Sequence, residues 1–172
     1  LGSLVSCGDK VLVPRFGRFG YLLTEIAQRV GGDVVTLDTE WGTVFETDRI
    51  CDAIREHRPR VVALVHGDTS TTMAQPLEGI SAACREVDAL LYVDTTATLC
   101  GMPIPVDDLQ LDAVSTGLQK CMSGPPGTSP ITINERAAAV VNNRKHIEGG
   151  IRPDDYVAGD GPKIISNYLD LG

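Results

Sequence analysis

Two kinds of hydrophobic pattern alternate along this chain: short runs of consecutive apolar residues, and longer segments in which apolar residues recur every three or four positions. The short runs predict strands at 11–13, 34–37, 61–65, 90–93, 112–115 and 130–133. The longer segments predict helices over 19–30, from an N-cap at Thr47 to a point before Pro59, over 77–87, and over 135–142. This alternation predicts an α/β fold, with a mostly parallel sheet flanked by helices on both faces.

The composition limits the classes of function that fit such a fold. The 172 residues are enough for one domain with a sizeable core, and 42% of them are hydrophobic and 22% charged. The formal net charge of -8 argues against binding to a phosphate backbone. No apolar run reaches the roughly 20 residues of a membrane helix, and the start of the chain does not show the pattern of a signal peptide.

The cysteines and histidines favour neither a disulfide framework nor a metal centre. The five cysteines are odd in number, no two have Cys-x-x-Cys spacing, and they stand among apolar residues. We therefore expect reduced, mostly buried thiols, as in a cytoplasmic protein. The three histidines are scattered and form no cluster with metal-ligand spacing, so a metalloenzyme is not expected.

Polar residues follow three of the predicted strands at the points where those strands end. The strand at 61–65 runs into 66–72 (His-Gly-Asp-Thr-Ser-Thr-Thr), the strand at 90–93 runs into Asp94-Thr95-Thr96, and the strand at 112–115 leads to Gln119-Lys120. Carboxyl ends of parallel strands share one edge of a sheet, so these three loops should converge there, where α/β sheets bind ligands. A hydroxyl, a carboxylate and an amine would then share one cleft.

An amine nucleophile together with a carboxylate is the layout that pyridoxal phosphate needs. The lysine forms a Schiff base with the cofactor, and the carboxylate keeps the pyridine nitrogen protonated so that the ring accepts electrons. Two plainer interpretations stay open on the residues alone. Lys120 would be a solvated lysine before a stiff surface loop, and Asp94 would cap a turn after its strand.

Other motifs are weaker. The segment 16–20 lacks the glycine pattern of a dinucleotide fingerprint, and 124–129 has no Gly-Lys-Ser/Thr and is no phosphate loop. A hydrolase built on His66 and Asp68 would lack the Gly-x-Ser-x-Gly elbow that presents a serine nucleophile. A nucleotide-binding Rossmann-like module without covalent chemistry, and a core that serves only folding or dimerisation, remain alternatives.

Three segments together resemble a known family. Segment 115–120 (Ser-Thr-Gly-Leu-Gln-Lys) with the Gly-Pro-Pro-Gly-Thr-Ser at 124–129, segment 66–72 and segment 93–101 are similar, in order and separation, to the active-site segments of class V pyridoxal-phosphate aminotransferases of the alanine–glyoxylate and serine–glyoxylate group. Within that group, 67–72, 119–121 and 166–172 look most like (S)-ureidoglycine–glyoxylate aminotransferases of purine (allantoin) catabolism. The resemblance implies a transaminase that passes an amino group from (S)-ureidoglycine to glyoxylate and gives glycine; the alternative amino donors are alanine and serine.

The resemblance also implies roles for three residues around the cofactor's reactive atoms. Lys120 would carry pyridoxal 5'-phosphate and move the proton between substrate carbon and cofactor carbon. Asp94 would pair with the pyridinium nitrogen. Thr69 would hydrogen-bond to the phenolic oxygen of the ring.

Three further residues would hold the cofactor in place, again by resemblance. Gln119 would help to hold the phosphate, Phe19 would stack on the ring, and Thr96 would pack against the opposite ring face. Ordinary core packing is the alternative for Phe19 and Thr96.

The family pattern carries expectations for the whole assembly as well. It implies the large, cofactor-binding domain of an aspartate-aminotransferase-like enzyme, and a homodimer with the cofactor site at the subunit interface. Residues 1–172 are expected to be part of that domain. The phosphate-binding turn is expected before Leu1, and a smaller C-terminal domain with the arginine for the substrate carboxylate after Gly172.

Overall fold

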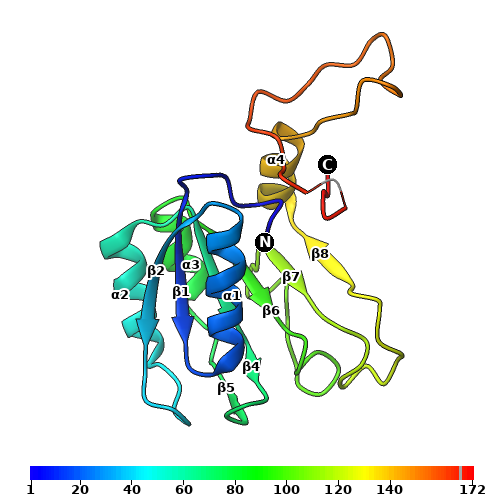
Figure 1. Ribbon diagram of the computed structural model, residues 1–172. Helices are drawn as coiled ribbons and strands as arrows, with labels where there is room; N and C mark the ends of the chain where they lie inside the picture. Colours follow the sequence, from blue (N-terminus) through cyan, green and yellow to red (C-terminus); the bar gives the residue numbers. More distant parts are fainter. Residues whose placement is uncertain (167) are drawn as a thin grey trace.

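The computed structural model describes residues 1–166 and 168–172 and confirms the predicted α/β architecture (Figure 1). The helices are α1 (Arg18–Arg29), α2 (Thr47–His57), α3 (Ile80–Glu86) and α4 (Glu135–Asn143). The strands are β1 (Lys10–Arg15), β2 (Asp33–Asp38), β3 (Val61–Val65), β4 (Gly67–Asp68), β5 (Met73–Ala74), β6 (Leu90–Asp94), β7 (Ala113–Ser115) and β8 (Ile131–Ile133). The C-terminal motif at 166–172 includes Asn167, which lies outside the described residues.

Six strands form one sheet in the order β2-β1-β3-β6-β7-β8, while β4 and β5 pair separately as a short antiparallel hairpin. Neighbours in the large sheet are parallel, except that β8 runs antiparallel to β7. The chain passes from β1 outwards to β2 and then returns to place β3 on the other side of β1. The strand order therefore reverses between β1 and β3, and such a reversal opens a crevice at the carboxyl ends of the strands.

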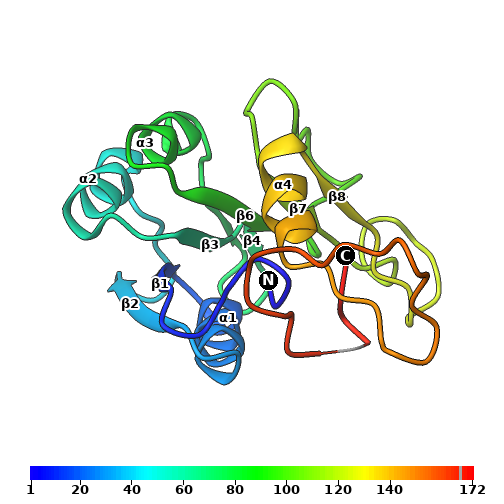
Figure 2. The ribbon, with the colours of Figure 1, turned by 90° about the horizontal axis from the view of Figure 1, so that it is seen from above.

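Helices cover both faces of the sheet, as Figure 2 shows: α1 lies on one face, and α2 and α3 lie side by side on the other. The central strand β3 is buried at every position, which explains its unbroken run of apolar side chains. Leu12, Ile54, Leu64 and Leu91 are among the largest side chains that are fully buried in the core between these layers. None of the described helices combines the length and the apolar character that a bilayer crossing requires.

Several details differ from the prediction, among them the starts of two helices and the exposure of the cysteines. Thr47 is the first residue of α2 and not its N-cap; the extended N-cap residue is Glu46. The third helix begins at Ile80 rather than at 77, because Gly79 just before it has the left-handed φ of 82°, which no helix interior adopts. The cysteines are not mostly buried: Cys51 and Cys84 are, but the other three are exposed because they lie in turns outside the packed elements.

A buried carboxylate holds the strands next to the centre of the sheet together. Asp112, fully buried just before β7, accepts hydrogen bonds from the Leu91 amide (2.8 Å), the Asn134 side chain (2.8 Å) and the Arg136 guanidinium (2.9 and 3.0 Å). These partners come from β6, the N-cap of α4 and its first turn. Asp112 thereby links β6, which ends in Asp94, to β7, which leads to Lys120.

Candidate active site

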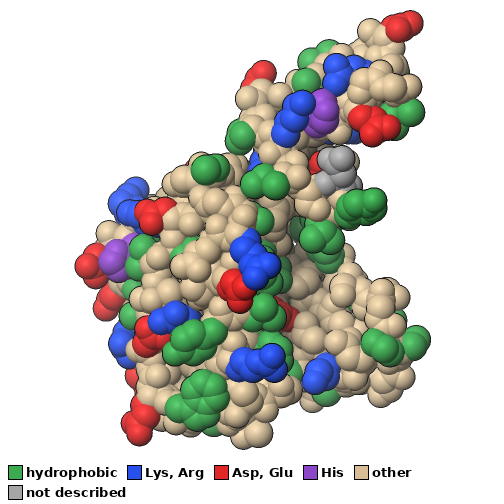
Figure 3. Space-filling model, viewed as in Figure 1, with side chains coloured by type: hydrophobic (Ala, Val, Ile, Leu, Met, Phe, Trp, Pro, Cys, Tyr) green, Lys and Arg blue, Asp and Glu red, His purple; other side chains and the backbone are tan. Residues whose placement is uncertain are grey.

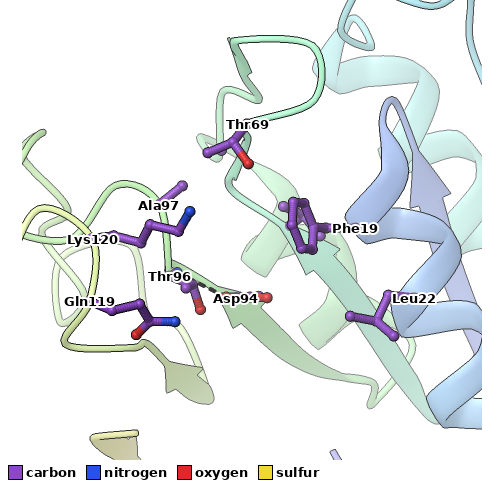
Figure 4. A pocket seen from close by; sticks show the side chains of 10 residues that line it. Phe19, Leu22, Thr69, Asp94, Thr96, Ala97, Gln119 and Lys120 are labelled. Atoms are coloured by element: carbon purple, nitrogen blue, oxygen red, sulfur yellow. Dashed lines mark hydrogen bonds between the residues drawn. The ribbon is translucent and has the colours of Figure 1, made fainter. Parts of the chain in front are cut away.

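The site residues predicted from the sequence meet in one cavity of about 360 Å³ at the carboxyl ends of the parallel strands. All six line it: Phe19, Thr69, Asp94, Thr96, Gln119 and Lys120. In Figure 4, Lys120 and Gln119 face Phe19 and Leu22 across the cavity, and Asp94 and Thr96 lie between them. Figure 3 shows the surface hollowed beside α1, towards the loops that follow β7. The volume is within the range of about 300–1,000 Å³ that is usual for small-molecule sites.

Asp94 is the last residue of β6 and is flanked by Val65 of β3 and Ser115 of β7. One carboxylate oxygen, Oδ1, accepts a hydrogen bond of 2.8 Å from the Thr96 amide, so Asp94 does cap the turn that follows it. Among the described residues, no donor is bonded to the other oxygen. The capping and cofactor-binding interpretations are therefore compatible, because the turn fixes the carboxylate and leaves one oxygen available to a ligand.

Lys120 is exposed to solvent and also lines the cavity. Its loop is held on both sides of the lysine. Before it, the Leu118 amide donates to the Thr128 carbonyl at 3.3 Å, and the Leu118 carbonyl accepts from the Gly124 amide at 2.8 Å. After it, the Cys121 thiol donates to the carbonyl of Ala97 at 3.3 Å, and Ala97 is itself part of the cavity wall. The segment after the lysine thus closes back on the lysine loop, so this loop is held in place although it lies at the surface.

Phe19 stands in the first turn of α1, and its ring packs against the hydrophobic core as well as lining the cavity. The Arg18 guanidinium lies 5.6 Å from the centroid of this ring. The backbone amide of Phe19 donates to the carboxylate of Asp68 at 2.8 Å. Since that carboxylate already occupies the N-terminus of α1, this helix end offers no free site for a phosphate group.

Four lining residues were not predicted from the sequence: Leu22, Val65, Gly67 and Ala97. Leu22 is three positions after Phe19 and so shares its side of α1, a spacing that could have identified it. A side chain at Gly67 would place its Cβ 2.3 Å from Cγ2 of Thr98, so this position excludes any larger residue. Val65 and Ala97 are apolar and carry no chemical signal in the sequence.

His66 and Asp68 do not form the relay that a hydrolase would need. Nδ1 of His66 is 2.8 Å from the Thr98 hydroxyl, and Asp68 accepts its hydrogen bonds from Phe19 and Ser70. Burial lowers the pKa of His66 from its usual value of 6.5, so the ring is neutral near pH 7. No group of three or more His, Cys, Asp or Glu side chains that could hold a metal ion occurs within the described ranges.

The side chains in the cavity fit pyridoxal phosphate. An aromatic ring, an amine, and a carboxylate with one oxygen available lie around one cavity, and hydroxyl and amide groups complete its polar lining. This set can take up an aldehyde on the amine and a protonated ring nitrogen on the carboxylate.

The model of the family described as "Aminotransferase class-V" matches residues 2–152. The (S)-ureidoglycine–glyoxylate transaminase of Bacillus subtilis (strain 168) is 49% identical to this chain over 99% of the chain. Alanine–glyoxylate aminotransferase of Rattus norvegicus is 35% identical over 84% of it. The crystal structure of ureidoglycine-glyoxylate aminotransferase from Bacillus subtilis matches 99% of the chain with a TM-score of 0.86 and 46% identity.

This chain spans less than half the length of each of these proteins. It covers 42% of the Bacillus subtilis transaminase, 35% of the rat aminotransferase, and 40% of the chain in the crystal structure. The family match at residues 2–152 nevertheless includes the whole cavity, since the residues that line it lie between positions 19 and 120.

Proposed function

Because this chain belongs to the class-V aminotransferase family, we propose that its protein is a pyridoxal-phosphate-dependent transaminase that moves the amino group of (S)-ureidoglycine to glyoxylate. The observation that carries the proposal is the convergence of Lys120, Asp94 and Phe19 in one cavity. The similarity to the Bacillus subtilis transaminase, at 49% identity over 99% of the chain, supports this amino donor in particular. In the net reaction the donor carbon becomes a carbonyl, and glyoxylate becomes glycine.

When bound, pyridoxal phosphate supplies an electron sink for the pair of electrons that remains when the donor carbon loses its proton. Lys120 would supply the amine that holds the cofactor, and its nitrogen would take the proton from the donor carbon and return it. Asp94 would hold a proton on the ring nitrogen through the oxygen that the Thr96 amide leaves available.

The other lining residues orient the ring. Phe19 offers an aromatic face on the side of the cavity opposite Lys120, and Thr96 lines it beside Asp94 (Figure 4). Thr69 offers a hydroxyl for the phenolic oxygen, and Gln119 offers an amide donor for the phosphate. Leu22 and Val65 add apolar wall on the side of α1 and β3.

We further propose that residues 1–172 are part of the cofactor-binding large domain, and that the protein acts as a cytoplasmic homodimer with this cavity at the subunit interface. The phosphate-binding turn and the small domain with the substrate-binding arginine would then belong to chain outside this range. The assignment of the phosphate-binding turn to another part of the protein is supported by α1, because the Asp68 carboxylate already occupies the N-terminus of this helix.

Reduction with borohydride tests the cofactor and the lysine together, because it makes the link between an aldehyde cofactor and a lysine amine permanent. After reduction and peptide mapping, we expect the added mass on the peptide that contains Lys120 and not on Lys10, Lys145 or Lys163. Absence of visible absorption, or a label on another lysine, would refute the proposal. Amino-donor assays on the protein from its full reading frame then separate ureidoglycine from alanine and serine.

A further inference from the structure

We propose that Asp68 is a positioning residue of the cofactor site: its buried carboxylate holds together the two cavity walls that carry Phe19 and Thr69. This inference rests on the proposed function, since the two walls are those that would contact the ring. Asp68 does not line the cavity itself, but it determines the arrangement of Phe19 and Thr69, which do.

The contacts of Asp68 join two distant segments. Its side chain is 2% exposed. Oδ2 accepts a hydrogen bond of 2.8 Å from the Phe19 amide, and Oδ1 accepts bonds from the amide (2.9 Å) and the hydroxyl (2.6 Å) of Ser70. Ser70 in turn accepts a bond of 2.9 Å from the Arg18 amide through its hydroxyl oxygen.

The first turn of α1 depends on this carboxylate because it supplies no cap of its own. Its N-cap residue, Gly17, has no side chain to accept a hydrogen bond, and the first turn contains no acidic residue. The amides of Arg18 and Phe19 would otherwise lack partners, as amides in the first turn of a helix do. Asp68 and Ser70 satisfy both amides and place a negative charge at the positive end of the helix.

Gly17, the N-cap residue of α1, leaves the space that the Asp68 carboxylate occupies. A Cβ at position 17 would stand only 2.5 Å from Oδ2 and 2.7 Å from Oδ1 of Asp68, distances that real Cβ atoms do not adopt. The backbone of Gly17 is extended, so the glycine is required by the close approach of the carboxylate and not by its φ angle. Only the glycine allows the carboxylate to reach the end of the helix.

The position of Thr69 follows from these anchors. Thr69 lies between Asp68 and Ser70, and the side chains of both neighbours are bonded to α1 at the turn that carries Phe19. The distance between the aromatic wall and the hydroxyl wall is therefore set by the Asp68 carboxylate together with the Ser70 hydroxyl that it binds. A carboxylate that served only as a helix cap would stabilise the fold without affecting the cofactor, and experiment can separate the two roles.

The experiment measures pyridoxal phosphate binding by visible absorption and by circular dichroism of the bound cofactor, on the protein from its full reading frame. In Asp68→Ala we expect the dissociation constant to rise about tenfold or more, as is typical when a group that orients a ligand-binding residue is removed. The dichroism per bound cofactor should also fall, because the ring is held less uniformly. Borohydride should still label Lys120 at saturating cofactor, so failure of this inference is distinct from failure of the proposed function.

Three further variants make the result decisive. Thr24→Ala removes a buried hydrogen bond to the Gly20 carbonyl within the same helix, so it should lower the melting temperature and leave the dissociation constant unchanged. Gly17→Ala should reproduce the binding defect with Asp68 intact. In a Phe19→Leu background, Asp68→Ala should have a smaller effect on binding than in the wild type, because the two residues act on the same wall.

The inference is overturned if Asp68→Ala binds the cofactor with wild-type affinity and dichroism, or if its effect is equally large in the Phe19→Leu background. Should Asp68→Ala not fold, Asp68→Asn decides the same question. The amide retains one acceptor oxygen but cannot serve both Phe19 and Ser70. Wild-type binding in Asp68→Asn would then overturn the inference, and weakened binding at a temperature where the variant is fully folded would support it.

Discussion

Replacing Asp112 by Asn should destabilise the protein strongly while changing its shape very little. The carboxylate is fully buried, and the substitution turns one of its acceptor oxygens into a donor. The Leu91 amide, now 2.8 Å from Oδ2, would face that donor and lose its acceptor. An unsatisfied buried amide costs about 1–3 kcal/mol, and loss of a charged partner adds a similar amount.

The size of the loss in stability depends on how well the Arg136 guanidinium is satisfied after the substitution. It also donates to the Ala89 carbonyl at 3.0 Å and to the Asp88 carboxylate at 3.4 Å, and its side chain is 26% exposed, so it keeps two acceptors and some water after the substitution. We therefore expect a loss of about 3 kcal/mol, the lower end of the range for breaking a buried ion pair. That loss is a large part of the roughly 5–15 kcal/mol by which most domains are stable.

Urea unfolding followed by far-ultraviolet circular dichroism measures this loss. With a slope of about 2 kcal/mol per molar urea, the midpoint should fall by about 1.5 M. The matched control is Asp52→Asn, the same substitution at an exposed carboxylate that pairs with Arg55 at 3.2 Å, where we expect no measurable shift. A shift in Asp112→Asn as small as in the control would refute the argument, because the buried network would then contribute nothing to stability.

Two further predictions concern the site, and a third concerns the pH dependence of stability. Lys120→Ala should abolish turnover and permanent labelling by borohydride while leaving the melting temperature unchanged, because the side chain is exposed; retained turnover would contradict the assignment. Asp94→Asn should reduce kcat by about 100-fold or more and raise the dissociation constant of the cofactor much less, because the amide still accepts the bond from Thr96 but carries no charge. An unchanged kcat would mean that Asp94 only caps the turn. Because the pKa of His66 is lowered in the folded protein, the unfolded chain takes up a proton first as the pH falls below about 6.5. The contribution of His66 to the free energy of unfolding is therefore full above that pH and declines below it. His66→Gln should therefore flatten the dependence of the free energy of unfolding on pH between about 7 and 5, and identical slopes in the two proteins would exclude His66 as the cause.

The predictable part of this fold is the part that local pattern determines. The run Val61–Val65 is apolar without interruption because β3 is covered on both faces, and the predicted bounds of this strand agree with the structure. Helix α1 differs by one residue at each end from its predicted range. Parallel strands then bring their carboxyl ends to one edge, so the polar residues that follow β3, β6 and β7 were expected to meet, and they do.

What could not be predicted depends on partners far apart in the sequence. The hairpin of β4 and β5 has two residues in each strand, too few for any periodic pattern. Nothing local distinguishes the reversed direction of β8 from that of a parallel strand. Asp112 looks like a polar residue at the start of a strand, and its burial depends on an arginine that comes 24 positions later.

Asp68 shows most clearly why a site is easier to predict than its support. In the sequence Asp68 is one polar residue beside a run of hydroxyl-bearing residues, and the only role that we considered for its side chain was in a hydrolase. Its actual partner is the amide of Phe19, and backbone amides carry no signal in a sequence. The nearest available signal is indirect: a helix whose N-cap is a glycine, and whose first turn lacks an acidic residue, needs a cap from elsewhere. Side chains that perform chemistry can be recognised by residue type and strand position, whereas those that position them are recognised only when the chain is seen in three dimensions.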